Sequence, residues 1–143
     1  MSPSLLLSIH LFAVAFWFGV LGVEFILEQG RTRNRDHGYT VADIHFKIDM
    51  FLEMPAFAVV LITGLMMLDP SKLSGLYLLK VIAGSIAVSG NIYCLYPILK
   101  RKLAANKRDF ESLVRYSRVI DNISLVAIPA GLVALFCGFY LVR

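Results

Sequence analysis

The chain has 143 residues, of which 58% are hydrophobic and 17% are charged, and its formal net charge is +4. This composition leaves too few polar side chains to cover a soluble domain of ordinary make-up. The positive charge does not indicate a nucleic-acid-binding protein, because the basic residues lie beside long apolar runs, where membrane topology accounts for them. We therefore expect a single integral membrane domain over residues 1–143.

Four apolar runs are long enough, with their flanks, to cross about 30 Å of hydrocarbon as helices. The expected spans are residues 3–28, 41–68, 73–99 and 119–142. Pro55 is expected to distort the second span, and the sequence Asp69-Pro70-Ser71 is expected to end its helix.

The basic residues are concentrated in two of the connections between spans. Three arginines lie within residues 31–35, and seven lysines and arginines lie within residues 100–118. The positive-inside rule therefore places these connections in the cytoplasm and both termini on the outer side. The expected fold class is all-α, an integral membrane four-helix bundle with up-down topology.

The first span carries ionisable groups where an ordinary membrane anchor has none. His10, Trp17 and Glu24 recur at heptad spacing, and Glu28 follows one turn later. At about 100° per residue these side chains share one stripe of a helix, while the opposite face is apolar. A lone charge in hydrocarbon costs several kcal/mol, so this stripe must pack against protein, a cofactor or water.

A second polar set begins the second span. His45, Asp49 and Glu53 follow one another at four-residue intervals on one helix face, and Glu24 and Glu28 form a similar pair on the preceding antiparallel helix. Carboxylates and an imidazole that converge from two helices can form a ligand set for a divalent cation. The candidate metal ligands are therefore Glu24, His45, Asp49 and Glu53.

The alternative interpretation gives these acids ordinary partners. Glu24 and Glu53 would then be held by Lys47, Arg115 or Arg118, or would be protonated, and the outermost charges would be solvated at the interface. Carboxylates that are brought close together repel one another unless a cation or a proton separates them. This repulsion favours a metal-binding or proton-handling role, most of all for the deeply placed Glu53.

His10 and Lys80 form an outer polar layer, about two turns in from the outer surface. His10 and Glu24 are about 21 Å apart along one helix, so they cannot ligate the same ion. His10 is either a core histidine bonded to a backbone carbonyl or an axial haem ligand, and Lys80 either faces this layer or extends to the headgroups. Room for a flat ring is expected at Gly19, Gly22 and Gly84.

The run from His10 to Trp17, followed by Phe18-Gly19, resembles the first span of two groups of small membrane proteins. These are the HemJ family of protoporphyrinogen oxidases and the CopD-like copper-resistance domains. HemJ proteins have similar length and four spans, and they pair a first-span histidine with a lysine early in the third. The matching residues are His10 and Lys80, the latter within Leu78-Leu79-Lys80-Val81. The resemblance implies haem b as cofactor, His10 as haem ligand, a catalytic Lys80 and a porphyrinogen substrate.

Three functions follow as expectations. The first is a haem-binding redox protein, an oxidoreductase of the bacterial inner membrane, with His10, Trp17 and Lys80 around the cofactor and a quinone as acceptor. The second is a non-enzymatic membrane protein that binds or passes copper or another divalent cation through the acids and His45. The third is an assembly subunit whose polar stripe pairs with another chain. The lipid bilayer is a partner in each case, a homodimer is compatible with all three, and no nucleic acid is expected.

Overall fold

The computed structural model describes residues 2–142, in which every regular element is a helix. The all-α prediction is therefore confirmed. In chain order the elements are α1 (Pro3–Gln29), the 3-10 turn η1 (Gly30–Thr32), α2 (Arg35–Ile48), the π-helical turn η2 (Asp49–Glu53), α3 (Met54–Met66), the 3-10 turn η3 (Pro70–Lys72), α4 (Gly75–Asn106) and α5 (Phe110–Val142).

Four helical stretches are long and apolar enough to cross a membrane: Pro3–Thr32, Arg35–Met66, Gly75–Asn106 and Phe110–Leu141. The second and fourth stretches begin several residues before their predicted spans. The third stretch ends several residues after its predicted span. Polar residues continue these helices because side chains cap them. Asn34 Oδ1 accepts the backbone N–H of His37 at the start of α2, and Asp109 Oδ1 accepts that of Ser112 at the start of α5.

The chain forms two compact units, and α4 and α5 each pass from one unit into the other. The first unit consists of Met1–Leu68 and Leu99–Val114, and the second of Asp69–Ile98 and Arg115–Arg143.

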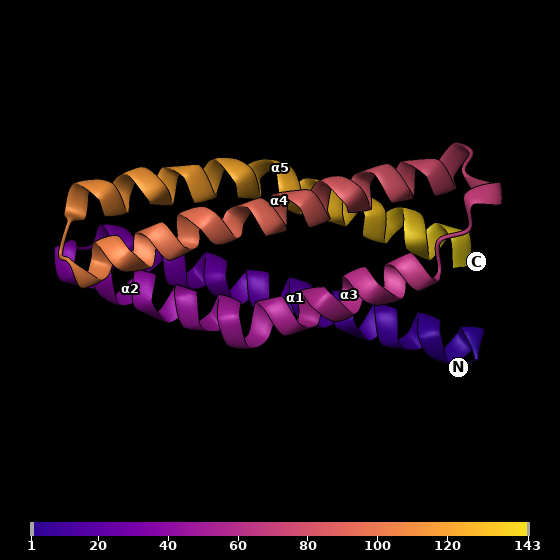
Figure 1. Ribbon diagram of the computed structural model, residues 1–143, viewed down its shortest axis with the longest axis horizontal. Coiled ribbons are helices and arrows are strands. Elements are labelled where there is room, and N and C mark those ends of the chain that lie inside the picture. Colours follow the sequence, from indigo (N-terminus) through magenta and orange to yellow (C-terminus); the bar gives the residue numbers. More distant parts are fainter. Residues whose placement is uncertain (1, 143) are drawn as a thin grey trace. The chain divides into compact units, whose positions relative to one another are not determined.

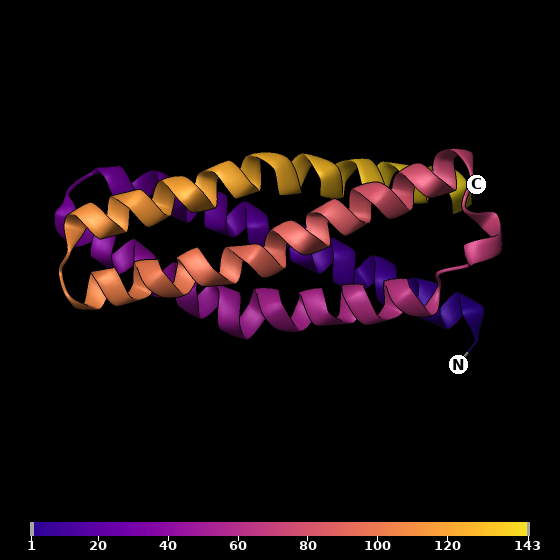
Figure 2. The same ribbon diagram turned by 45° about the horizontal axis from the view of Figure 1, so that its top comes forward.

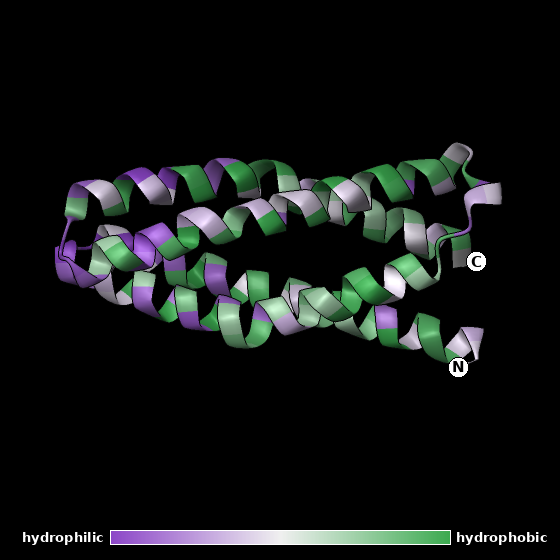
Figure 3. Ribbon diagram, in the orientation of Figure 1, coloured by the Kyte–Doolittle hydropathy of each residue, from purple (hydrophilic) through white to green (hydrophobic). Residues whose placement is uncertain are grey.

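In the first unit α1 lies antiparallel to the continuous helix formed by α2, η2 and α3 (Figures 1 and 2). Its polar stripe faces that helix, whereas Phe12 and Phe25 point outward. The hydrophilic residues of this unit gather around η1 and the start of α2 (Figure 3). The stripe predicted for the first span is thus the packed face of α1, whose buried residues are Ala13, Val14, Trp17, Val20 and Glu24.

The π-helical turn η2 lies directly before Pro55, where the sequence predicts a distortion. The backbone N–H of Met54 bonds to the carbonyl of Asp49, five residues earlier. Proline has no N–H to donate, and its ring crowds the carbonyl of the fourth preceding residue, here Phe51. A widened turn accommodates that crowding, and Asp49 and Glu53 lie at its two ends.

The connection between α3 and α4 is closed by the side chain of Asp69. Its carboxylate accepts hydrogen bonds from the hydroxyl and the backbone N–H of Ser71, and it lies 3.1 Å from Lys72 Nζ. These hydrogen bonds hold the pKa of Asp69 below its ordinary value. Because α3 ends at Met66 and η3 begins at Pro70, the prediction that this sequence ends the helix is confirmed.

In the second unit, small residues allow α4 and α5 to approach each other closely. A Cβ atom added at Gly90 would lie 2.7 Å from the Cβ atom of Ala127, closer than two such atoms can come. Close approach at small residues is a common mode of helix packing in membranes. Cys94 and Cys137 are both buried in this unit and are not joined in a disulfide.

Replacing Gly90 by alanine is therefore expected to destabilise the protein by about 1–3 kcal/mol, because the added methyl group overpacks the contact with Ala127. Gly84→Ala on the same helix is the matched control, since its Cβ atom would lie 3.9 Å from Ala134, an ordinary contact. Thermal unfolding of the detergent-solubilised variants, followed by circular dichroism, measures the difference. Equal melting temperatures for the two variants would contradict the close approach at Gly90.

Candidate metal centre

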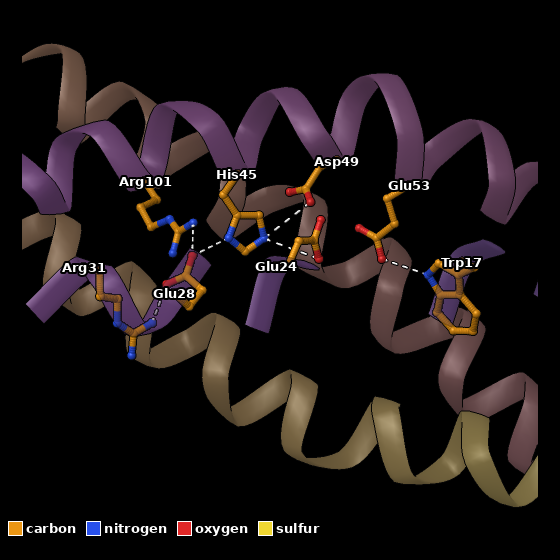
Figure 4. Close-up of polar contacts among 8 residues, drawn as sticks. All are labelled: Trp17, Glu24, Glu28, Arg31, His45, Asp49, Glu53 and Arg101. Atoms are coloured by element: carbon orange, nitrogen blue, oxygen red, sulfur yellow. Dashed lines mark hydrogen bonds and ion pairs between the residues drawn. The ribbon is translucent and has the colours of Figure 1, made fainter. Parts of the chain in front are cut away.

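Three buried side chains of the first unit converge from α1, α2 and η2: Glu24, His45 and Asp49 (Figure 4). One potential ligand atom from each lies within 4.8 Å of the other two. His45 Nε2 is 3.8 Å from Glu24 Oε2 and 3.4 Å from Asp49 Oδ1. Their exposed fractions are only 6% for Glu24, 5% for His45 and 0% for Asp49. The structure thus brings together three of the four residues that the sequence proposes as metal ligands.

The local fold accounts for this convergence. His45 and Asp49 are four residues apart, so their side chains point from the same face of one helix. Glu24 comes from the polar stripe of α1, which runs antiparallel against that face. The three side chains therefore meet because two polar stripes pack against each other.

Three carboxylate oxygens in the cluster have no hydrogen-bond partner among the described residues: Glu24 Oε1 and both oxygens of Asp49. A buried carboxylate oxygen without a partner costs several kcal/mol, so native proteins rarely leave one unsatisfied. A cation bound between Glu24 and Asp49 would satisfy these oxygens and cancel the repulsion between the two acids. The cluster therefore has the chemistry of a cation site.

Glu28 orients the imidazole ring of His45. Its carboxylate accepts hydrogen bonds from Arg31 Nη1 and Arg101 Nη2, each at 2.8 Å, and contacts His45 Nδ1. A carboxylate that is held by two guanidinium groups is an acceptor, so Nδ1 of His45 is the donor and Nε2 carries the lone pair of the neutral ring. Nε2 is the nitrogen that faces the cluster. A carboxylate behind a histidine in this way is the usual outer shell of a metal-bound imidazole.

Arg101 also belongs to this network, although its place in the sequence indicates only a basic residue in a connection between two spans. Its exposed fraction is 1%, and it reaches Glu28 from α4. The sequence does hold a signal for its burial, because Arg101 continues a stripe of buried residues with Cys94, Ile98 and Ala105 at helical spacing. An arginine on such a face is buried with its acid partner rather than solvated.

The fourth predicted ligand, Glu53, has a different contact. Its carboxylate accepts a hydrogen bond of 2.9 Å from the indole Nε1 of Trp17. The alternative partner Lys47 instead pairs with Asp43 at 2.6 Å, near the surface, and Lys102 contacts the same carboxylate. The expectation that Lys47 holds Glu24 or Glu53 is therefore wrong, because a nearer and more exposed acid lies one turn before it on the helix.

The imidazole of His10 contacts a threonine hydroxyl group on α3. The Oγ1 atom of Thr63 lies 2.8 Å from His10 Nδ1 and 2.5 Å from the carbonyl oxygen of Val59. Since the threonine donates its proton to that carbonyl, it accepts from His10, and the lone pair of the neutral ring is on Nε2. This tautomer is the one that an axial haem ligand bound through Nε2 requires.

The glycines and the lysine predicted for the outer layer have other surroundings, each described within its own unit. The glycine beside His10 is Gly64, where an added Cβ atom would lie 3.4 Å from His10 Cε1, whereas nothing lies within 4 Å of one added at Gly19 or Gly22. Lys80 belongs to the second unit, half-buried along α5, with its Cε atom 3.5 Å from the position of a Cβ atom on Gly138.

Replacing Arg101 by methionine is expected to destabilise the protein by about 3–5 kcal/mol, because it leaves the Glu28 carboxylate with one fewer partner in a buried network. Lys47→Met is the matched control, since Asp43 keeps a second lysine and Lys47 is mostly exposed. That change should cost about 1 kcal/mol or less. Chemical unfolding of both variants tests the contrast, and similar losses would argue against a buried network at Arg101.

Comparisons with known proteins do not assign the chain to a family. The chain matches no protein-family model, no curated protein and no solved structure. Its function must therefore follow from the contacts, burial and charges of its own residues.

Proposed function

We propose that this chain is an integral membrane protein that binds a divalent cation through Glu24, His45 and Asp49. The observation that supports it best is the set of three buried carboxylate oxygens without a hydrogen-bond partner, beside a histidine whose Nε2 faces them. Oxygen and imidazole ligands suit Zn²⁺, Mn²⁺ and Fe²⁺, whereas Cu⁺ prefers thiolate and thioether sulfur. The donor set therefore favours one of these divalent ions over Cu⁺.

The charges of the network favour a divalent ion over a monovalent one. With the acids ionised and His45 neutral, the carboxylates exceed the guanidinium groups by two charges, which one divalent cation would balance. The groups that enter this count are the carboxylates of Glu24, Glu28, Asp49 and Glu53 and the guanidinium groups of Arg31 and Arg101.

The proposal places the site in the cytoplasmic half of an up-down four-helix bundle in the bacterial inner membrane, with both termini outside. Its support is the positive-inside rule, because the basic residues lie around η1 and around the turn between α4 and α5. The centre is then close to the cytoplasmic surface, within reach of ions from that side.

Purified protein that has been stripped with a chelator is expected to bind about one Zn²⁺, Mn²⁺ or Fe²⁺ per chain by elemental analysis and calorimetry. His45→Ala and Asp49→Asn should weaken binding by more than about 100-fold, the upper range for changes outside the ligand shell. His37→Ala and Asp43→Asn are the matched controls, since both residues lie on α2 away from the cluster. Wild-type protein that takes up no cation, or His45→Ala protein with unchanged affinity, would overturn the proposal.

A second proposal is the haem-binding redox protein that the resemblance to HemJ proteins implies. The observation in its favour is the Thr63 hydroxyl, which holds His10 in the tautomer that an axial ligand needs. His10 would hold the iron, Lys80 would act toward a porphyrinogen substrate, and haem b would supply the electron transfer.

If this second proposal holds, purified protein should show a Soret band that is absent in His10→Ala. Thr63→Val should weaken haem retention, because it removes the acceptor that orients the ring. His45→Ala is the control and should retain the band, since it lies in the other polar layer. Colourless protein that does not take up added haem, or an unchanged band in His10→Ala, would rule out His10 as the ligand.

A further inference from the structure

We infer that Glu53 is a fourth ligand of the cation and that Trp17 is the residue that positions it. This inference rests on the proposed cation site. Glu53 is 4% exposed and lies at the end of the π-helical turn that begins at Asp49. Trp17 Nε1 donates to its Oε1 at 2.9 Å, in a contact that is buried on both sides.

The hydrogen bond with Trp17 engages one oxygen of the Glu53 carboxylate. The indole has a single N–H, so it fixes Oε1 and turns Oε2 to the other side of the group. Figure 4 shows that second oxygen on the side of Glu24. Glu53 therefore presents an oxygen toward the cluster while Trp17 holds the opposite one.

The backbone of η2 keeps Glu53 beside Asp49. The hydrogen bond from the Met54 N–H to the Asp49 carbonyl spans the whole turn between the two acids. With Glu53 included, the set becomes one imidazole and three carboxylates, and four donors match the coordination number that is usual for zinc.

Trp17 is itself held firmly enough to orient a ligand. Its exposed fraction is 6%, and its ring packs against Phe57 at a centroid distance of 6.0 Å in an edge-on arrangement and against Phe18 at 5.3 Å. Trp17 thus orients Glu53 from outside the proposed ligand shell, as Glu28 orients His45. Outer-shell partners of this kind typically change metal affinity by about 10–100-fold when they are removed.

The test compares Zn²⁺ affinity in wild-type protein, Trp17→Phe and Glu53→Gln by calorimetry. Trp17→Phe keeps an aromatic ring but loses the N–H, and it should bind Zn²⁺ about 10–100-fold more weakly. Glu53→Gln should bind more weakly still, because it loses the ligand charge. Phe57→Leu is the matched control, since it disturbs the packing of Trp17 and leaves its N–H in place, and its affinity should stay close to that of the wild type.

A second readout separates ligation from a purely structural contact. Trp17 is the single tryptophan of the chain, so tryptophan emission reports on the surroundings of this one side chain, its hydrogen bond to Glu53 included. Addition of Zn²⁺ should change the emission of the wild type in step with binding, and the change should be lost in Glu53→Gln. Where Glu53→Gln folds poorly, the emission change of the wild type and the weaker Zn²⁺ binding of Trp17→Phe together test the inference.

The outcomes distinguish this inference from the proposed function. Wild-type protein that binds no Zn²⁺, Mn²⁺ or Fe²⁺ would overturn both. Wild-type protein that binds Zn²⁺ without a change in Trp17 emission, or with the same affinity as Glu53→Gln, would overturn only the role of Glu53 and Trp17. A structural role alone would lower the melting temperature of Trp17→Phe and leave its Zn²⁺ affinity unchanged.

Discussion

The polar layer of the first unit depends on the Glu28 carboxylate, which joins three helices through its contacts with His45, Arg31 and Arg101. Charges that leave water must recover the lost hydration through hydrogen bonds of good geometry, and a half-satisfied set is worse than an apolar core. In this layer the carboxylate of Glu28 has hydrogen-bond partners. Three carboxylate oxygens of Glu24 and Asp49 have none among the described residues. Glu28 and Asp49 lie on adjacent helices, yet of the two only the carboxylate of Asp49 lacks hydrogen-bond partners in the described part of the chain. This difference makes the cluster a candidate cation site.

Helix α1 contributes side chains both to this layer and to the contact between His10 and Thr63. One stripe presents His10 toward Thr63, Trp17 toward Glu53, and Glu24 toward His45. Because successive members of the stripe are about 10 Å apart along the axis, each meets a different part of the opposing helix. A single heptad pattern thereby builds several distinct polar contacts, each within one pair of antiparallel helices.

Much of this arrangement could be predicted from local pattern. The four apolar runs indicate the membrane-length helices, and the spacing of His45, Asp49 and Glu53 places them on one face. Thr63 could not be assigned in this way, because its burial depends on which face of the helix meets its neighbour, and the helical stripe that indicates the burial of Arg101 does not identify its partner Glu28. Pro55 signals a distortion, but the sequence alone does not distinguish a kink from a π-helical turn. Local periodicity is a property of one segment, whereas these contacts depend on tertiary packing.

The π-helical turn also preserves the phase of the helix that contains it. In a regular α-helix, each residue added or removed rotates everything beyond it by about 100° relative to what comes before. The wider turn at Asp49–Glu53 takes up one extra residue, so His45 faces Glu24 before the turn while Thr63 faces His10 after it. Removing one residue within this turn is therefore expected to restore an uninterrupted α-helix with both contacts still aligned, whereas the same deletion elsewhere between His45 and Thr63 would turn one of the two side chains away from its partner.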